Sequence, residues 1–143
     1  MAEQSIAVPP GPIALVVCDN VYESSEGKRA LVGLFTKITA RDFPALHGKL
    51  CVYVSITNVK RFTTCKVEVV CGETDVVVVA AEGPMPDLNN PLAVWDLVFE
   101  FRNLVFPEPG KYYVRFFGNS TPLLERPFEV VKLAAAREGE EKT

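Results

Sequence analysis

Large apolar residues alternate with polar or smaller residues along several stretches of the chain. In the stretch 49–58, every second residue from Leu50 to Ile56 is a large aliphatic residue, and a similar alternation runs through 62–71. A period of two is typical of a β-strand with one face against a core. No stretch shows the longer period of an amphipathic helix, so the pattern predicts an all-β fold.

Turn-forming residues separate these apolar stretches at short and regular intervals. Many short strands with such spacing favour a single antiparallel β-sandwich over a parallel α/β sheet. We therefore expect an immunoglobulin-like sandwich with a Greek-key connection, which the Pro- and Asn-rich loop 82–91 would supply. The expected strands are 13–22, 29–38, 49–58, 62–71, 75–81, 92–104, 111–117 and 123–133.

The pattern also predicts two local features. Trp95, the only tryptophan, begins a row of alternating apolar residues in 92–104 and is therefore expected in the core. The stretch 39–48 breaks the alternation with Asp42 and Pro44. We expect a loop there, with a single helical turn over the end of the sandwich.

The stretch 107–131 is the clearest sign of this fold class. Two runs rich in aromatic and β-branched residues flank a polar turn at 118–122, which reads Gly-Asn-Ser-Thr-Pro. Such a pattern is typical of a β-hairpin. We expect 107–131 to form the hairpin that closes the sandwich.

Two of the expected strands are apolar on both sides. The stretch 76–79 contains four consecutive valines, and 112–117 carries aromatic residues on both faces. One face of each sheet should meet solvent, so a second apolar face needs cover from another segment of the chain or from a partner. Both explanations remain open. In the second, the interface would contain Val77, Val79, Tyr113, Arg115 and Phe117.

The length of 143 residues suits one domain with a substantial core. Residues 1–12 contain three prolines and little apolar alternation, and we expect an extended leader there. The sandwich would occupy 13–133. Residues 134–143 are rich in charge and are expected to form a flexible polar tail.

The charge balance argues against a nucleic-acid partner. The formal net charge is -3, from 15 basic and 18 acidic residues, so the chain has no cation excess to neutralise phosphates. No Lys or Arg precedes Lys28, and the apolar run 13–18 is too short for a signal peptide or a membrane span. We expect a cytoplasmic protein without a membrane partner.

The four cysteines are expected to be reduced in such a compartment. They are Cys18, Cys51, Cys65 and Cys71. Cys65 and Cys71 fall on one expected strand, where a rise of about 3.3 Å per residue holds them beyond bridging distance. We expect buried thiols that behave as small apolar side chains.

One enzymatic hypothesis follows from the single histidine. His47 precedes Cys51 by four residues, and a thiol beside an imidazole base is the pair that a cysteine-dependent hydrolase uses. No family-type signature surrounds either residue. A surface histidine next to an inert thiol is the favoured interpretation.

Metal sites form a second group of alternatives. The cysteines and His47 lack the short paired spacing of structural zinc sites. Calcium could bind at one end of the sandwich, where Asp19, Glu23 and Glu26 lie near one turn and Asp87 lies in a long loop. Calcium requires six to eight oxygen ligands, and these acids are scattered. Solvated turn acids are the favoured interpretation, and no metal or cofactor is expected.

The end of the chain resembles immunoglobulin-like domains. It reads Gly-Lys-Tyr-Tyr-Val at 110–114 and Pro-Phe-Glu-Val-Val at 127–131, which resembles the last two strands of such domains. The resemblance implies that Tyr112 corresponds to a tyrosine-corner residue, whose ring is buried and whose hydroxyl bonds to backbone.

Over nearly its full length, the chain also resembles a family of short bacterial proteins of unknown function. The resemblance rests on 14–20, on Gly-Leu-Phe at 33–35 and on Phe-Pro-Ala at 43–45. These motifs are strands and turns. They imply a bacterial origin and assign no site residue.

We therefore expect a non-enzymatic β-sandwich that acts as a binding or interaction module for a protein partner or for a second copy of itself. A small cysteine-dependent hydrolase is one alternative. Binding of calcium or a small ligand by loops at the end of the sandwich is another.

Overall fold

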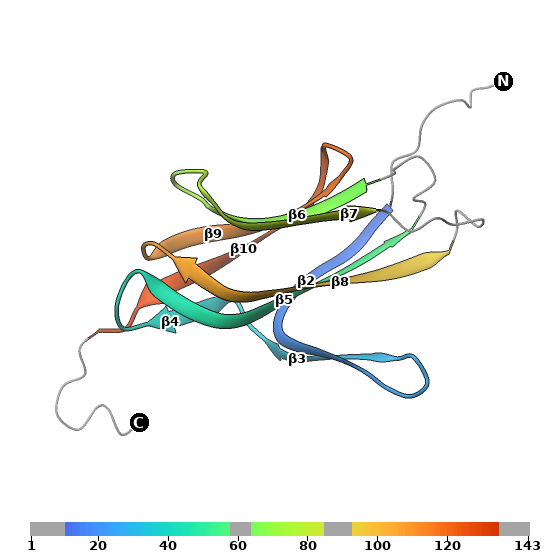
Figure 1. Cartoon of the computed structure of the whole chain (residues 1–143), viewed down its shortest axis with the longest axis horizontal. Coiled ribbons are helices and arrows are strands. Elements are labelled where there is room, and N and C mark those ends of the chain that lie inside the picture. Colours follow the sequence, from blue (N-terminus) through green and yellow to red (C-terminus); the bar gives the residue numbers. More distant parts are fainter. Residues whose placement is uncertain (1–10, 58–63, 85–92, 135–143) are drawn as a thin grey trace.

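A computed structural model describes residues 11–57, 64–84 and 93–134, and these form two packed β-sheets (Figure 1). The all-β prediction is confirmed. No described residue belongs to a helix long and apolar enough to cross a membrane. The described strands are β2 (Gly11–Glu23), β3 (Arg29–Leu34), β4 (Lys37–Ala40), β5 (Ala45–Thr57), β6 (Thr64–Cys71), β7 (Val77–Pro84), β8 (Val94–Phe106), β9 (Gly110–Gly118) and β10 (Thr121–Lys132).

The strand order is that of an immunoglobulin-like sandwich. One sheet has the order β4-β10-β9-β6-β7 and the other the order β3-β2-β5-β8. β5 pairs with β8 and β6 pairs with β9, so the consecutive strands β5 and β6 lie in different sheets, as do β8 and β9. This interlocking is the arrangement of immunoglobulin folds. The expected crossover, 82–91, lies mainly outside the described residues, although 82–84 belong to β7.

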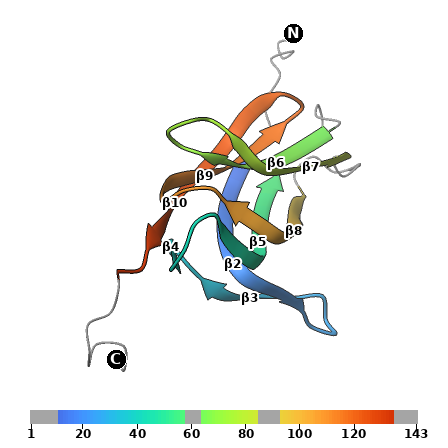
Figure 2. The ribbon, with the colours of Figure 1, turned by 60° about the vertical axis from the view of Figure 1, so that its left-hand side comes forward.

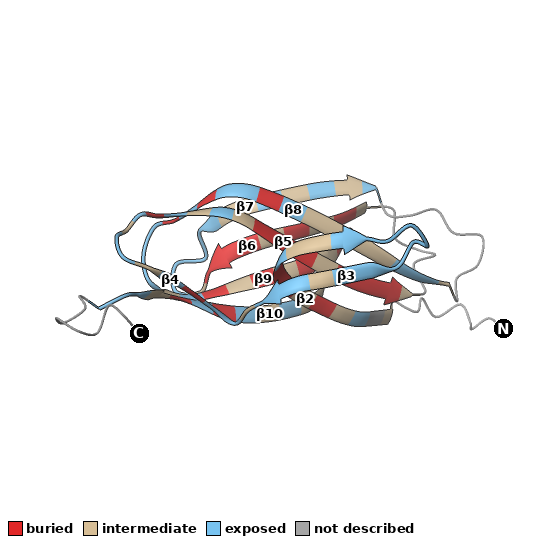
Figure 3. Ribbon diagram, turned by 90° about the horizontal axis from the view of Figure 1, so that it is seen from below, coloured by how far each residue is buried: buried red, intermediate tan, exposed pale blue. Residues whose placement is uncertain are grey.

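The core lies between the facing surfaces of the two sheets, where the buried residues of Figure 3 are concentrated. Leu50, Val52, Val54 and Ile56 of β5 are all fully buried, as their alternation predicted. Burial of one such side chain contributes about 1.5–3 kcal/mol. The alternating strands therefore provide most of the force that holds the sheets together.

The closing hairpin is confirmed, since β9 and β10 pair along nearly their whole length. Tyr112 on β9 and Phe128 on β10 both face the core, with ring centroids 5.9 Å apart. Phe106 of β8 lies edge-on to Tyr112 at 5.0 Å. Aromatic contacts of this geometry stabilise a core beyond their burial alone.

The alternation in β8 changes phase near its end. Phe101 is buried, and a period of two would bury residue 103 next. The next buried residue is instead Leu104, followed by Phe106. Asn103 lies in this gap and has a φ of 56°. The left-handed conformation of Asn103 interrupts the regular pleat and turns Leu104 toward the core.

The prediction that Trp95 lies in the core is wrong. Trp95 pairs with Ile56, which faces the core, but Trp95 belongs to the second residue pair from the end of the β5–β8 ladder. Its exposed fraction is 39 %, whereas Ile56 is fully buried. At its end of the sheet, the indole is only partly covered by other side chains.

The expected strand 29–38 is in fact two strands in different sheets. β3 ends at Leu34, and β4 begins at Lys37 and pairs in parallel with β10. The loop expected at 39–48 is also shorter than predicted and contains no helical turn, because β4 extends to Ala40 and β5 begins at Ala45.

A β-bulge explains the valine run better than cover on both faces. Val79 pairs with Val69 and Val77 pairs with Val70, so Val78 is an extra residue in β7. The bulge lets Val78 and Val79 both pack against the core. Val77 is 47 % exposed, so no described segment of the chain covers this face of the strand, and cover by a partner stays a prediction.

β2 is shared between the sandwich and a projecting hairpin. Its residues up to Cys18 pair with β5, and its residues from Cys18 onward pair with β3. β3 hydrogen-bonds to no other described strand. We call residues 18–34 the β2–β3 arm. Figures 1 and 2 show the arm outside the two packed sheets, and Figure 3 shows β3 without a buried residue. Arg29 of the arm forms an ion pair with Asp96 of β8 at 3.8 Å, so the arm lies over the outer face of the four-stranded sheet.

Candidate functional site

The predicted interface residues of β9 lie on the outer face of the five-stranded sheet. Tyr113, Arg115 and Phe117 are half-buried and alternate with fully buried residues. The Arg115 guanidinium lies 5.7 Å from the centroid of the Tyr113 ring, and Lys66 Nζ lies 4.8 Å from that of Phe117. Arg115 Nε also donates to Glu125 Oε2 at 2.7 Å. These aromatic rings are therefore partly covered by cations of the same chain.

A hollow of about 450 Å³ lies beside these residues. Its walls come from the neighbouring ends of β9 and β10 and carry both apolar and charged groups. The lining residues are Arg115, Phe117, Pro122, Leu123, Leu124 and Glu125.

The two predicted interface valines lie on different faces. Val77 pairs with Val70, which in turn pairs with Tyr113, and this row belongs to the outer face. Val79 pairs with the buried Val69 and packs against the core. Val79 is therefore not part of the surface that contains Tyr113.

His47 and Cys51 are not brought together. His47 pairs with Leu104 on the core side, and its ring lies between Phe35 and Phe106 at centroid distances of 6.1 and 6.2 Å. Cys51 adjoins the core-facing Val52 and so points to the other face of β5. Four residues of strand separate the two by about 13 Å. This geometry does not allow the imidazole to deprotonate the thiol.

The expected metal ligands do not converge within the described part of the chain. No group of three or more His, Cys, Asp or Glu side chains there could hold a metal ion. Glu26 forms an ion pair with Lys28 at 3.6 Å, and the Asp19 side chain lies against Gly33. Asp87, the fourth expected calcium ligand, lies outside the described residues.

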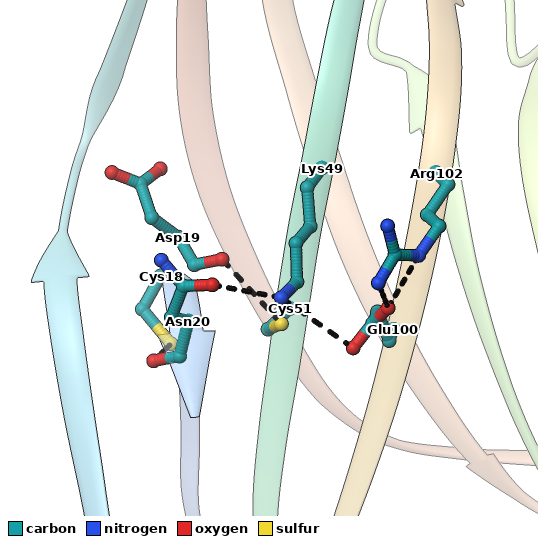
Figure 4. Close-up of polar contacts among 7 residues, drawn as sticks. All are labelled: Cys18, Asp19, Asn20, Lys49, Cys51, Glu100 and Arg102. Atoms are coloured by element: carbon teal, nitrogen blue, oxygen red, sulfur yellow. Dashed lines mark hydrogen bonds and ion pairs between the residues drawn. The ribbon is translucent and has the colours of Figure 1, made fainter. Parts of the chain in front are cut away.

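A pair of cysteines, which the sequence analysis did not predict, lies on the outer face of the four-stranded sheet. Cys18 of β2 stands directly opposite Cys51 of β5 in the antiparallel ladder (Figure 4). Both are buried, yet neither belongs to the core cluster between the sheets. Their spacing of 33 positions carries no motif, so only the strand register could have identified the pair.

Polar side chains surround the cysteine pair. Lys49 Nζ donates to Asn20 Oδ1 at 2.7 Å and lies 3.7 Å from Glu100 Oε1, so it links β2 and β8 across β5 (Figure 4). Glu100 also forms an ion pair with Arg102 at 2.6 Å. Burial raises the pKa of the Cys51 thiol, while the Lys49 ammonium lowers it in part. Burial likewise raises the pKa of Cys18.

The other two cysteines belong to the five-stranded sheet. Cys65 and Cys71 lie at opposite ends of β6 and face the core, so neither can reach the other. Burial raises the pKa of Cys71, but hydrogen bonds from Thr74 and from the backbone of Glu73 lower it more. All four thiols are free, as expected.

The arm carries exposed apolar side chains on the face that contains Cys18. Leu34 pairs with Cys18, Val32 pairs with Asn20, and Tyr22 follows two residues further along β2. The exposed fractions of Tyr22, Val32 and Leu34 are 56 %, 47 % and 63 %. Sequence reasoning missed this surface because it merged β3 with β4 into one strand.

The strand order and the buried tyrosine corner define an immunoglobulin-like β-sandwich. A family model described as a family of unknown function (DUF6941) matches residues 13–131. The chain belongs to this family, which confirms the resemblance to a family without assigned function. A search of curated proteins finds no match.

A solved structure with some similarity is that of an immunoglobulin-like protein (PA1606) from Pseudomonas aeruginosa. The two chains share 13% sequence identity, with a TM-score of 0.46. The similarity covers 87% of this chain and 98% of that one.

Proposed function

We propose that this protein is a non-enzymatic interaction module whose partner is a second copy of the same chain, bound through the β2–β3 arm. The main observation that supports this proposal is the exposed apolar face of the arm, where Tyr22, Val32 and Leu34 lie together on a hairpin outside the sandwich. Exposed apolar surface of this kind is typical of protein interfaces.

The free edge of β3 supports this proposal. β3 is the last strand of its sheet, so one side of its backbone has no strand partner among the described residues. Natural edge strands usually carry charges or proline that block further pairing. The other edge strands carry charged residues, such as Lys37 in β4, Glu82 in β7 and Asp96 in β8. In β3 only the first residue, Arg29, is charged, and 30–34 contains no charged residue and no proline.

A second copy fits this edge without opposing like charges. In an antiparallel pairing of two β3 strands centred on Val32, each Val32 faces the other and each Ala30 faces Leu34 of the second chain. Apolar side chains then meet on one face of a continuous sheet, as in other isologous contacts. The small net charge of -3 adds little repulsion between the copies.

Size-exclusion chromatography with light scattering, over the micromolar to millimolar range, tests the proposal. We expect a concentration-dependent dimer that V32K abolishes, because two lysines would then oppose each other at the centre of the interface. V77K is the matched control, since Val77 is also an edge-strand valine with an exposed fraction of 47 %. V77K should dimerise like the wild type.

Two results would overturn the proposal. One is a wild-type monomer throughout the concentration range. The other is a dimer that V32K leaves intact and V77K disrupts, which would place the contact on the five-stranded sheet. Circular dichroism of both variants checks that each remains folded, which is expected because both positions are exposed.

A further inference from the structure

The register of β2 and β5 brings two thiols to the same point of the ladder. Cys18 and Cys51 are direct partners, flanked by the pair Val17 and Val52. Directly opposed residues of an antiparallel ladder have Cα atoms about 4.5–5.5 Å apart. A disulfide needs about 4.4–6.8 Å between Cα atoms. The backbone spacing of this ladder therefore suits a bridge without strand movement.

The two sulfur atoms also point to a shared region. Cys18 Sγ donates to the carbonyl oxygen of Asn20 at 3.4 Å, and Cys51 Sγ donates to that of Asp19 at 3.6 Å. These carbonyls belong to consecutive residues of β2. Both thiols thus lie against the same short segment, and Figure 4 shows them on the neighbouring strands β2 and β5.

From this geometry we infer that Cys18 and Cys51 form a disulfide-modification site, which a small-molecule disulfide such as oxidised glutathione converts to an intramolecular bridge. The inference is independent of the proposed self-association, because it rests on the register within one chain.

The cover over the pair consists of the arm backbone at 19–21 and of surface side chains, and not of the core between the sheets. The side chains of Lys49 and Glu100 are 33% and 39% exposed, and both can rotate into solvent. Cys65 and Cys71, by contrast, belong to the cluster between the two sheets, where they lie at opposite ends of β6. All four thiols are almost fully buried, so the arm must open locally before an oxidant reaches Cys18 and Cys51. Only these two of the four stand directly opposite each other in a ladder.

The reaction proceeds by two thiol–disulfide exchanges. The thiolate of one cysteine attacks a sulfur of oxidised glutathione, which forms a mixed disulfide and releases one glutathione thiolate. The second cysteine loses its proton and attacks the protein sulfur of that mixed disulfide, which releases the second glutathione. Two protein thiols are oxidised, and one glutathione disulfide is reduced to two thiols.

The bridge would hold the first residue of the arm covalently to the sandwich. Cys18 is the residue of β2 that pairs both with Leu34 of the arm and with Cys51 of the sandwich. A covalent bond at this position would hold the arm to β5 and close the loop that contains β3 and β4. Amide hydrogen exchange near Cys18 should slow on oxidation.

Mass spectrometry of the native protein after equilibration with oxidised glutathione tests the inference. We expect the wild type to lose the mass of two hydrogen atoms and to yield a peptide in which Cys18 is joined to Cys51. A reductant should reverse both changes. The double variant C65A/C71A keeps only the proposed pair and should behave in the same way.

The single variants C18A and C51A are the matched controls, and each should instead keep a glutathione adduct on the remaining thiol. The apparent melting temperature of the wild type should rise on oxidation and that of C51A should not. A stable glutathione adduct on the wild type, a bridge that includes Cys65 or Cys71, or an unchanged mass while a control thiol peptide oxidises would each overturn the inference.

Discussion

The Tyr112 hydroxyl donates a hydrogen bond to the carbonyl oxygen of Glu108 at 2.6 Å. The two residues lie four positions apart across the turn that opens β9, and Tyr112 is fully buried. The role of Tyr112 that the immunoglobulin resemblance implied is therefore confirmed. This hydrogen bond links the turn to the core, because the Tyr112 ring packs against the buried rings of Phe106 and Phe128.

Replacement of Tyr112 by phenylalanine should lower the free energy of unfolding by about 1 kcal/mol, because the ring stays and only the hydrogen bonds of its hydroxyl with the Glu108 backbone are lost. Urea denaturation measures the change. Tyr113, next along β9 but half-buried on the outer face, provides the control. Y113F should change the free energy by less than about 0.5 kcal/mol. Equal losses in the two variants would contradict a role for the hydroxyl of Tyr112.

The position of Trp95 gives a second prediction. Trp95 is 39 % exposed, whereas Phe106 is fully buried. Truncation of a buried phenylalanine to alanine costs about 3–5 kcal/mol. We expect W95A to cost less than half as much as F106A in urea denaturation. Acrylamide should also quench the fluorescence of native Trp95 readily. Strong protection from acrylamide would show that the indole is covered.

The two strands with the clearest alternation show what the sequence could predict. In β5 the pattern correctly identified the buried face from Leu50 to Ile56, because these residues follow a regular pleat between two neighbouring strands. In β8 the same reasoning failed for Trp95. Alternation reports which side a residue points to, but not whether the opposite sheet extends far enough to cover it.

The arm and the cysteine pair could not be predicted for a different reason. Both depend on register, which a single sequence does not specify across the 16 positions from Cys18 to Leu34 or the 33 from Cys18 to Cys51. The split of 29–38 depends on a chain that changes sheets after Leu34, and no strong breaker marks this point. The bulge at Val78 likewise places the neighbouring residues Val78 and Val79 both against the core, which a strict period of two would not predict.

Gly33 is predicted to be required for the shape of the arm. Its φ is 78°, and a Cβ atom there would lie 2.5 Å from Asp19 Oδ2. G33A should therefore lower the free energy of unfolding by at least about 1 kcal/mol. Gly83, where a Cβ would meet no atom within 4 Å, is the control. Similar stabilities of G33A and G83A, measured by thermal denaturation, would contradict this view of the arm.

The buried cysteine pair also predicts a dependence of stability on pH. Burial raises the pKa of both Cys18 and Cys51 in the folded protein. In the unfolded chain each thiol ionises around its ordinary pKa of about 8.5. The stability that the protonated thiols contribute is therefore complete below that pH, and it is lost as the pH rises toward the higher pKa of the folded state.

The double variant C18A/C51A lacks these groups but keeps every tyrosine, so the ionisation of Tyr53 and Tyr112 affects both proteins alike. Under reducing conditions, the free energy of unfolding of the wild type should fall more steeply than that of the variant between about pH 8 and 10. The difference in slope is the quantity to compare, because the alanines also change the absolute stability. Parallel curves would mean that the two thiols ionise equally easily in the folded and unfolded chains.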